Sequence, residues 1–198
     1  MEMKREHAAA FTLIELLVVI VIIAVLMGLA FPVFSSIQNQ AKKTQAKNDL
    51  TQIVTAVNAF YTEYGKYPSV TADTIYGPAG TAGNNALFDV LRAINVTENP
   101  RQITFISPPD AKNPIQPRSG IGTSTGSGQF FDPWGTAYNI EVDGNYDSQI
   151  TNPYSTNAGS PTLRIGVIAW SYGTDLGSET AATDKNIGKN KDDVISWQ

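Results

Sequence analysis

Residues 11–34 read FTLIELLVVIVIIAVLMGLAFPVF, an apolar run that contains a single charged side chain, Glu15. Between Leu16 and Phe34 there is no charge at all. At about 1.5 Å per residue, such a helix crosses most of a hydrocarbon core roughly 30 Å thick. A carboxylate near its start costs on the order of 2 to 4 kcal/mol in lipid unless a cation meets it. We therefore expect a transmembrane helix over residues 11–34, in which Glu15 either meets a cationic partner or simply reaches the headgroup region.

The residues before this run are polar and carry basic side chains. Residues 1–10 read MEMKREHAAA, and Lys4 and Arg5 lie just ahead of the apolar segment. Basic residues at that position keep their end of a membrane helix in the cytoplasm. An alternative is a secretory signal peptide that is cut after Ala30. The length of the apolar run, the charge of Glu15 and the helical pattern that continues beyond Ala30 favour the first interpretation.

Residues 10–20, AFTLIELLVVI, resemble the N-terminal motif of type IV pilins and of the pseudopilins of type II secretion. The resemblance implies that residues 1–10 are a leader and that prepilin peptidase, a membrane aspartyl peptidase, cuts between Ala10 and Phe11. The same enzyme would then methylate the new amine of Phe11. Glu15 would face the Phe11 amine of a neighbouring subunit during filament assembly. The family prefers glycine before the cut, where this chain has Ala10.

The composition narrows the classes of function. The net charge is −4 and the pI is about 4.9, which disfavours nonspecific nucleic-acid binding. There is no cysteine, and the one histidine, His7, lies in the expected leader. Thiol catalysis, histidine-based triads and thiolate zinc sites are therefore excluded from the mature chain. No nucleophile–base pair is recognisable, so we expect no enzyme.

The helix is expected to continue beyond the membrane segment. Pro32 predicts a kink or a loosened turn, because it removes one backbone hydrogen bond, and a proline here also matches the pilin pattern. Residues 37–64 contain neither proline nor glycine, and Gly65 suits a helix end. One helix from Phe11 to about Tyr64 would be roughly 80 Å long. Its second half predicts an apolar face of Leu50, Ile53, Val54, Val57, Phe60, Tyr61 and Tyr64. The opposite face carries Lys42, Lys43, Lys47, Asn48, Asp49 and Gln52.

The rest of the chain predicts short elements separated by turns. Residues 84–95 predict a short helix, with Asn84 as its N-cap and Leu87, Val90, Leu91 and Ile94 on one face. Residues 107–129 are rich in proline and glycine, and 120–128 predict a flexible surface loop. Asp132-Pro-Trp-Gly135 is a strong turn signal. Strands are predicted over 103–106, 137–142 (half-buried), 163–171 and 194–197.

Several of these segments resemble the major, G-type pseudopilin of type II secretion: residues 41–50, 64–68, 132–135 and 171–175. The resemblance implies an α+β pilin-like fold, in which the long helix packs on a small antiparallel sheet. It implies a single-pass inner-membrane protein with a cytoplasmic N-terminus and a periplasmic globular domain over residues 35–198. The chain would form a homopolymeric filament that helps to drive protein export, together with an inner-membrane assembly platform and minor pseudopilins.

Two other functions remain open. A type IV pilus subunit for motility, adhesion or DNA uptake would carry the same N-terminal motif. A membrane-anchored periplasmic module could bind a glycan or another partner through Trp134, Trp170 and Trp197.

A polar stretch over residues 172–193 offers oxygen ligands for a metal. Calcium takes six to eight oxygens, which Asp175, Ser178, Glu179, Asp184, Asp192 and Asp193 could supply from a flexible loop. The resemblance implies that Ca²⁺ binds here through Asp175 and Asp193, with the backbone carbonyl of Tyr172. Ser178 and Asp192 complete the expected set. The alternative is a solvated loop of mixed charge.

Overall fold

The computed structural model describes residues 11–68, 70–177 and 183–198, without the side chains of residues 29–33. The chain divides into two compact units, one ending at Ala41 and one spanning Lys42–Gln198. The expected leader, with Ala10, lies outside the described residues, as do Ser178 and Glu179.

The long helix is confirmed. Helix α1 runs over Leu13–Tyr64 and continues through Pro32, where the predicted kink stays a prediction. In the first unit every described side chain from Phe11 to Gly28 is exposed. Among the described residues, no helical stretch is long and apolar enough to cross a membrane. The transmembrane assignment of residues 11–34 therefore stays a prediction.

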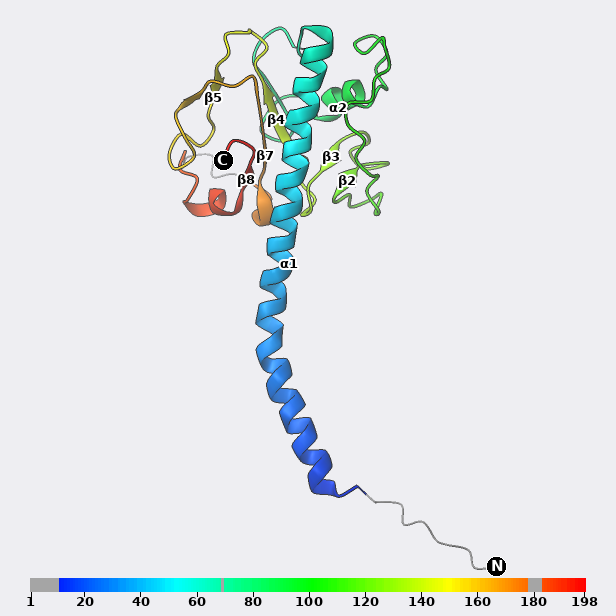
Figure 1. Cartoon of the computed structure of the whole chain (residues 1–198), viewed down its shortest axis with the longest axis vertical. Coiled ribbons are helices and arrows are strands. Elements are labelled where there is room, and N and C mark those ends of the chain that lie inside the picture. The colour runs from blue at the N-terminus through cyan, green and yellow to red at the C-terminus, as the bar shows by residue number, and fades with distance from the viewer. Residues whose placement is uncertain (1–10, 69, 178–182) are drawn as a thin grey trace, which may run out of the picture. The chain divides into compact units, whose positions relative to one another are not determined.

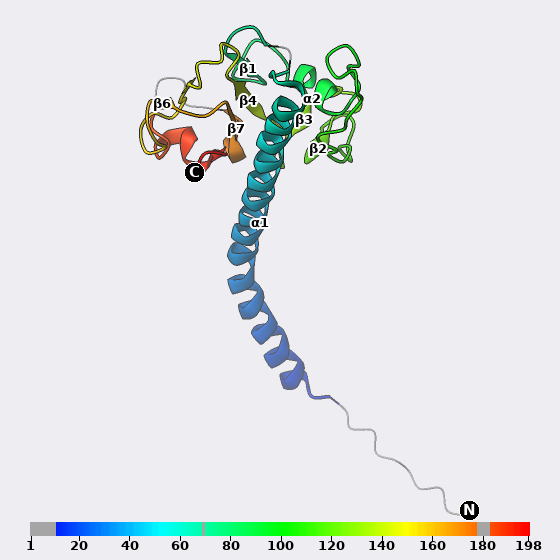
Figure 2. The same ribbon diagram turned by 45° about the horizontal axis from the view of Figure 1, so that its top comes forward.

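The second unit has the predicted α+β architecture. Within the described ranges, an antiparallel sheet has the strand order β1 (Thr74–Tyr76), β4 (Asn139–Val142), β7 (Val167–Ser171) and β8 (Val194–Ile195). In its register Ile140 pairs with Ala169, and Trp170 pairs with Ile195. The α1 segment from Lys42 onward packs beside this sheet (Figures 1 and 2).

The two faces of the sheet belong to two separate cores. On one face, side chains such as Ile140 and Ala169 join the buried residues of α1. On the other face, Ile168 and Trp170 pack with Ile150 and other residues of the segment between β4 and β7. Alternate residues of a strand point to opposite faces. Since a core covers each face of the sheet, both sets of side chains are buried. Strand β4 is consequently buried at all four positions, and the predicted half-buried strand is wrong in that respect.

Smaller elements flank the sheet. Helix α2 (Asn85–Leu91) and the hairpin of β2 (Gly120–Ile121) with β3 (Phe130–Phe131) lie on one side of α1. Strands β5 (Ile150–Thr151) and β6 (Thr162–Leu163) form a second hairpin toward the other side. The 3₁₀ turns η1 (Gly173–Asp175) and η2 (Gly188–Asp192) precede β8.

The apolar face of α1 is confirmed with one exception. Leu50, Ile53 and Phe60 are fully buried, whereas Tyr61 is 40% exposed and stacks on Tyr67. The polar face is also less uniform than predicted. Lys47 donates a hydrogen bond to the Ile195 carbonyl at 2.7 Å, and Asp49 accepts one from the Tyr138 hydroxyl at 2.8 Å. These side chains bond to groups at the sheet, because the sheet reaches round the helix beyond its apolar stripe.

Around α2 three predictions are wrong. Asn84 precedes α2 but does not cap it through its side chain. Ile94 is exposed, because α2 ends at Leu91. Residues 103–106 form no strand; instead the Phe105 amide bonds to the Leu91 carbonyl at 2.8 Å.

Two predictions further along also need correction. The predicted strand over 163–171 is divided into β6 and β7 at Gly166, where an added Cβ would lie 1.9 Å from the Tyr67 hydroxyl. The predicted surface loop 120–128 begins with a buried strand, β2. The turn at Asp132–Gly135 and the strand near 194–197 are confirmed.

Candidate functional site

The first turn of α1 holds Glu15 in a local hydrogen-bonded arrangement. Glu15 Oε2 accepts hydrogen bonds from the Thr12 amide at 2.8 Å and from Thr12 Oγ1 at 2.6 Å. In return, the Glu15 amide donates to Thr12 Oγ1 at 3.3 Å. This is a capping box, in which two residues satisfy helix-terminal amides reciprocally. The chain thus provides Glu15 with two hydrogen-bond donors of its own. Both donors are neutral, so the negative charge of Glu15 is not compensated by them.

The side chains around Glu15 form an extended apolar surface. Phe11 is 77% exposed and Leu13 82% exposed, and large apolar side chains are exposed as far as Met27. Monomeric proteins rarely leave apolar surface of this extent in water. The start of α1 is therefore a candidate contact surface.

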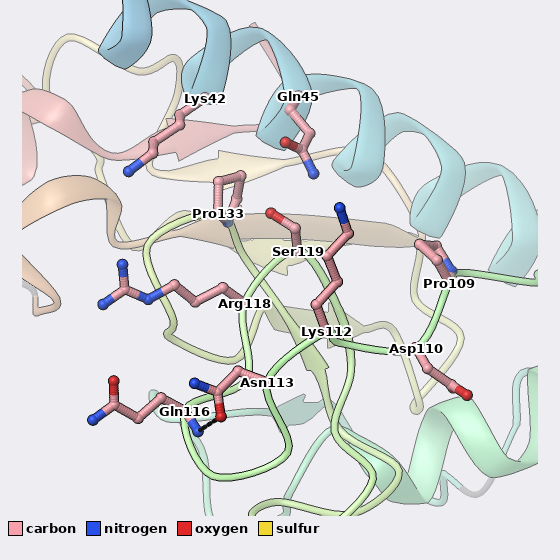
Figure 3. A pocket seen from close by; sticks show the side chains of 10 residues that line it. All are labelled: Lys42, Gln45, Pro109, Asp110, Lys112, Asn113, Gln116, Arg118, Ser119 and Pro133. Carbon is pink, nitrogen blue, oxygen red and sulfur yellow. Dashed lines mark hydrogen bonds between the residues drawn. The ribbon is translucent and has the colours of Figure 1, made fainter. Parts of the chain in front are cut away.

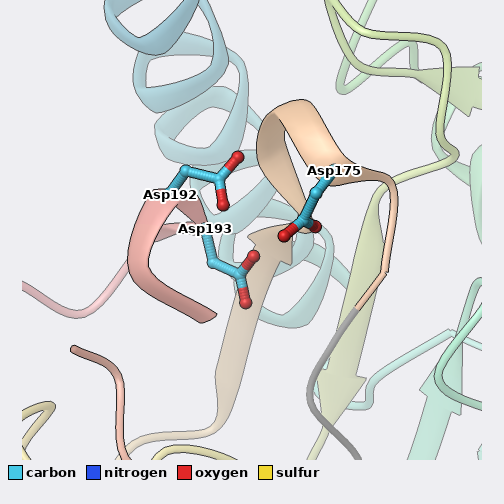
Figure 4. A group of neighbouring side chains, drawn as sticks. All are labelled: Asp175, Asp192 and Asp193. Atoms are coloured by element: carbon cyan, nitrogen blue, oxygen red, sulfur yellow. The ribbon is translucent and has the colours of Figure 1, made fainter. Parts of the chain in front are cut away.

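A second site lies at the end of the chain, where three carboxylates converge. Oxygen atoms of Asp175, Asp192 and Asp193 lie within 4.8 Å of one another (Figure 4). Asp175 ends η1, Asp192 ends η2, and Asp193 leads into β8. The turns η1 and η2, which are separated in the sequence, thus place their carboxylates in one cluster.

A glycine allows this close approach. Gly173 adopts φ +68°, and a Cβ at this residue would lie 2.6 Å from the Asp192 carbonyl oxygen. The neighbouring Thr174 amide donates to Asp192 Oδ2 at 2.5 Å. Only glycine adopts this conformation without strain and fits this space. Gly173 therefore permits the short distance between η1 and η2.

Asp193 is the buried member of the cluster. Its Oδ2 accepts a hydrogen bond from the Tyr154 hydroxyl, whereas its Oδ1 is buried without a partner among the described residues. Burial raises the pKa of Asp193 to about 7, and Asp192 and Asp175 add to the rise. The nearby Lys185 acts in the opposite direction, but its ammonium group donates to the Asn190 carbonyl at 2.8 Å. An orphaned carboxylate oxygen beside two further acids is the donor chemistry that a hard divalent cation requires.

The structure therefore brings together Asp175, Asp192 and Asp193, and the residues fit a calcium ion. Asp184, which offered a further oxygen, lies apart and accepts a hydrogen bond from Asn157 at 2.8 Å. The contribution of the Tyr172 carbonyl stays a prediction. Sequence reasoning missed Tyr154, since nothing in its local pattern indicates that it reaches a residue 39 positions away.

The tryptophans do not form a binding surface. Trp134 is 6% exposed and Trp170 2% exposed, both within the cores. Trp197 is partly buried and donates from Nε1 to the Ala158 carbonyl at 2.8 Å. A glycan module built on these three residues is therefore wrong.

Comparison with known families identifies the N-terminal site. Residues 6–31 match the model described as the prokaryotic N-terminal methylation motif. The chain carries a type IV pilin-like N-terminus. The methylation motif includes Phe11, Thr12 and Glu15, the residues of the capping box and its preceding aromatic.

Relatives of this pilin-like chain include a secretion protein and a pilin. The type II secretion system core protein G of Pseudomonas aeruginosa is 40% identical over 67 residues, which cover 34% of this chain and 47% of the relative. The type IV major pilin protein PilA of Myxococcus xanthus is 35% identical over 68 residues, which cover 34% of this chain and 31% of the relative. The matches thus span less than half the length of these relatives. No solved structure matches the chain.

Proposed function

We propose that this chain is a structural, non-enzymatic subunit of a type II secretion pseudopilus, which polymerises through its N-terminal helix to help drive protein export. The observation that carries the proposal is the methylation motif at the start of a 52-residue helix whose first turns expose apolar side chains. The similarity to core protein G supports the secretion system. A long helix with an apolar, unpartnered start suits lipid before assembly and a helix bundle afterwards.

The proposed processing and assembly steps use the residues of the motif. Prepilin peptidase would cut between Ala10 and Phe11 and methylate the Phe11 amine. In the inner membrane the Phe11 amine of one subunit would meet Glu15 of the next. An ion pair in a low-dielectric surrounding gains more than one at a surface, but it must first overcome desolvation. The pair would therefore set the register between subunits as much as it adds stability.

A type IV pilus subunit is the second candidate. The similarity to the pilin PilA supports it, and the N-terminal motif fits both systems equally. A pilus would retract and extend beyond the cell, whereas a pseudopilus works within the periplasm together with the assembly platform and minor pseudopilins.

We also propose that Asp175, Asp192 and Asp193 hold Ca²⁺, with Ser178 and the Tyr172 carbonyl as further ligands. The support is the convergence of the three acids and the partnerless Oδ1 of Asp193. When bound, the cation would supply the positive charge that these carboxylates lack. It would thereby join η1 to η2 and fix the end of the chain against the sheet.

The decisive test of the filament role is Glu15→Ala in the full-length chain. We expect normal membrane insertion and loss of filaments and of secretion, and Glu15→Asp serves as the conservative comparison. Intact-mass analysis of the wild-type protein taken from membranes supplies the second readout. A start at methylated Phe11 supports the proposal, whereas a start at Phe31 indicates ordinary secretion. Normal filaments and secretion from Glu15→Ala would refute the assembly mechanism.

A further inference from the structure

One cavity of the second unit lies between α1 and the loop over residues 109–119 (Figure 3). Its volume is about 730 Å³. The charged side chains that line it are Lys42, Lys112, Arg118 and one acid, Asp110. The cavity therefore carries a positive excess in a chain whose net charge is −4. We call it the basic cleft.

The cations of the basic cleft are not engaged by the part of the chain that the structure describes. In the described ranges, Lys42, Lys112 and Arg118 make neither an ion pair nor a hydrogen bond. Their nitrogen atoms are spread round the cavity, with Lys42 and Arg118 toward one side and Lys112 toward Gln45 and Ser119 (Figure 3). A spread of this kind suits several separate negative charges better than one small anion.

Two exposed carboxylates lie at the opposite end of the same unit, and neither forms an ion pair with a described residue. Asp147 is exposed in the loop that follows β4, and exposed Asp73 accepts hydrogen bonds from the amides of Gly144 and Asn145 at 3.2 and 3.4 Å. We call Asp73 and Asp147, together with the loop that follows β4, the acidic edge.

The acidic edge is fixed to the C-terminal end of α1. The Tyr67 amide, just beyond that end, donates to the Tyr146 hydroxyl at 2.9 Å, and the two rings stack. Tyr61 of α1 also lies 6.5 Å from the Tyr146 ring. Lys42 of the basic cleft is 19 residues earlier on the same helix, a separation of about 30 Å along the axis. The basic cleft and the acidic edge thus lie at opposite ends of the unit.

We propose that the basic cleft of one copy binds the acidic edge of a second copy of this chain. The inference rests on the proposed function and deepens it, because it assigns a subunit contact outside the N-terminal helix. A contact between two different patches of the same chain is heterologous, and such contacts generate open helical polymers wherever the rotation between subunits does not close a ring. Complementary charges steer the approach and fix the register of the contact.

Charge reversal with rescue tests the contact in the full-length chain, with sheared filaments quantified by immunoblotting and electron microscopy. Lys112→Glu with Arg118→Glu should reduce filament yield about tenfold, because attraction becomes repulsion at two positions. Asp73→Lys with Asp147→Lys should reduce it similarly, and the four changes together should restore the yield. Asp73 also accepts hydrogen bonds from backbone amides, so its substitution could disturb the fold. A second set of variants therefore leaves Asp73 unchanged and consists of Arg118→Glu, Asp147→Lys and the two combined.

The control is Arg164→Glu, a reversal of an exposed cation outside the basic cleft, which should leave the yield unchanged. Unfolding midpoints of the purified full-length variants show whether each still folds. Normal yield from the folded cleft variant would overturn the inference while the pseudopilus proposal stands. Loss without rescue by the combined changes would also overturn it, because the cleft would then bind another acidic partner. Absence of filaments from the wild-type chain would instead refute the proposed function.

Discussion

The hydroxyl of Tyr154 donates a hydrogen bond to Oδ2 of Asp193, while the other oxygen of Asp193 is buried without a partner. Tyr154 comes from the segment between β5 and β6, and Asp193 from the start of β8. One bond therefore holds the carboxylate of Asp193, which lies in one cluster with Asp175 and Asp192. A neutral hydroxyl can orient a carboxylate but cannot balance the charge of three acids.

Calcium should stabilise the wild-type protein through this cluster. At a calcium concentration about 100-fold above the dissociation constant, binding adds about 2.7 kcal/mol. For a chain of this size, that raises the unfolding midpoint by about 5 to 10 °C. Asp193→Ala should abolish the calcium-dependent rise, measured by thermal unfolding of the full-length protein in detergent with and without chelator.

Asp184→Ala is the matched control for the calcium prediction. Asp184 is an acid of the same polar stretch but lies outside the cluster. It should retain the full calcium response. An equal response from both variants would show that the cluster does not hold the ion.

Asn84 should contribute strongly to stability for a reason unrelated to helix capping. Its Nδ2 donates to the carbonyls of Phe130 and Tyr138 at 3.1 and 2.9 Å, and its Oδ1 accepts from the Phe130 amide at 3.1 Å. Asn84→Ala removes all three bonds and leaves the buried Phe130 amide without this acceptor, while the Phe130 carbonyl keeps a bond from the Tyr138 amide at 3.0 Å. We expect a cost of about 2 kcal/mol. Urea unfolding of the full-length protein measures the loss. Asn85→Ala, at the adjacent and half-buried residue, should cost much less, and a similar cost for both would contradict the role of the buried amide.

The sequence predicted the parts of the fold that depend on local pattern. The period of Leu50, Ile53, Val57 and Phe60 fixed the buried face of α1, because each turn of a helix repeats the same contact. The turn at Asp132 followed equally from local chemistry, since proline and glycine occupy the positions that the turn requires. The acids at 175, 192 and 193 were among the oxygen-bearing residues that type alone proposed, whereas Asp184, proposed in the same way, lies outside the cluster. The resemblance to the G-type pseudopilin had singled out Asp175 and Asp193.

The errors arose where distant contacts decided the structure. Asn84 has the residue type of a cap, but two strands more than 40 residues away offered its side chain better partners. Tyr61 continues the apolar stripe, yet it stays partly exposed and stacks on Tyr67. Strand β1 was missed because three residues carry too little periodicity to predict a strand. The basic cleft likewise joins α1 to a loop over 60 residues later, which no local pattern indicates.

Glu141 should make the stability of the protein depend on pH. It lies on β4 between Ile75 and Ile168, and burial, with a smaller contribution from Asp73, raises the pKa of its carboxyl from 4.5 to about 7. The folded state therefore binds this proton more tightly than the unfolded state. The resulting stability is complete below pH 4.5 and is lost as the pH rises to about 7. Glu141→Gln, which stays neutral, should be more stable than wild type at pH 8 by about 3 kcal/mol.

Unfolding free energies of wild type and Glu141→Gln between pH 4 and 8 check this prediction. The difference between the two profiles isolates Glu141 from other titrating groups, because those are common to both proteins. The difference should grow from pH 4.5 to 7 and then stay constant. Parallel profiles would mean that Glu141 is not protonated preferentially in the folded state.

Thr12 should hold the first turn of α1 together through Glu15. Thr12→Val keeps the branched shape but removes the hydroxyl that donates to Glu15 Oε2 and accepts from the Glu15 amide. The Thr12 amide still donates to Glu15, so the capping box is weakened by about 1 kcal/mol and not destroyed. Amide hydrogen exchange over residues 12–15 should accelerate about fivefold in the full-length protein in detergent. Thr12→Ser should restore wild-type exchange, and Thr12→Val should add little to Glu15→Gln, because both changes disturb the same pair. Additive effects of the two changes would mean that Thr12 and Glu15 act on the helix independently.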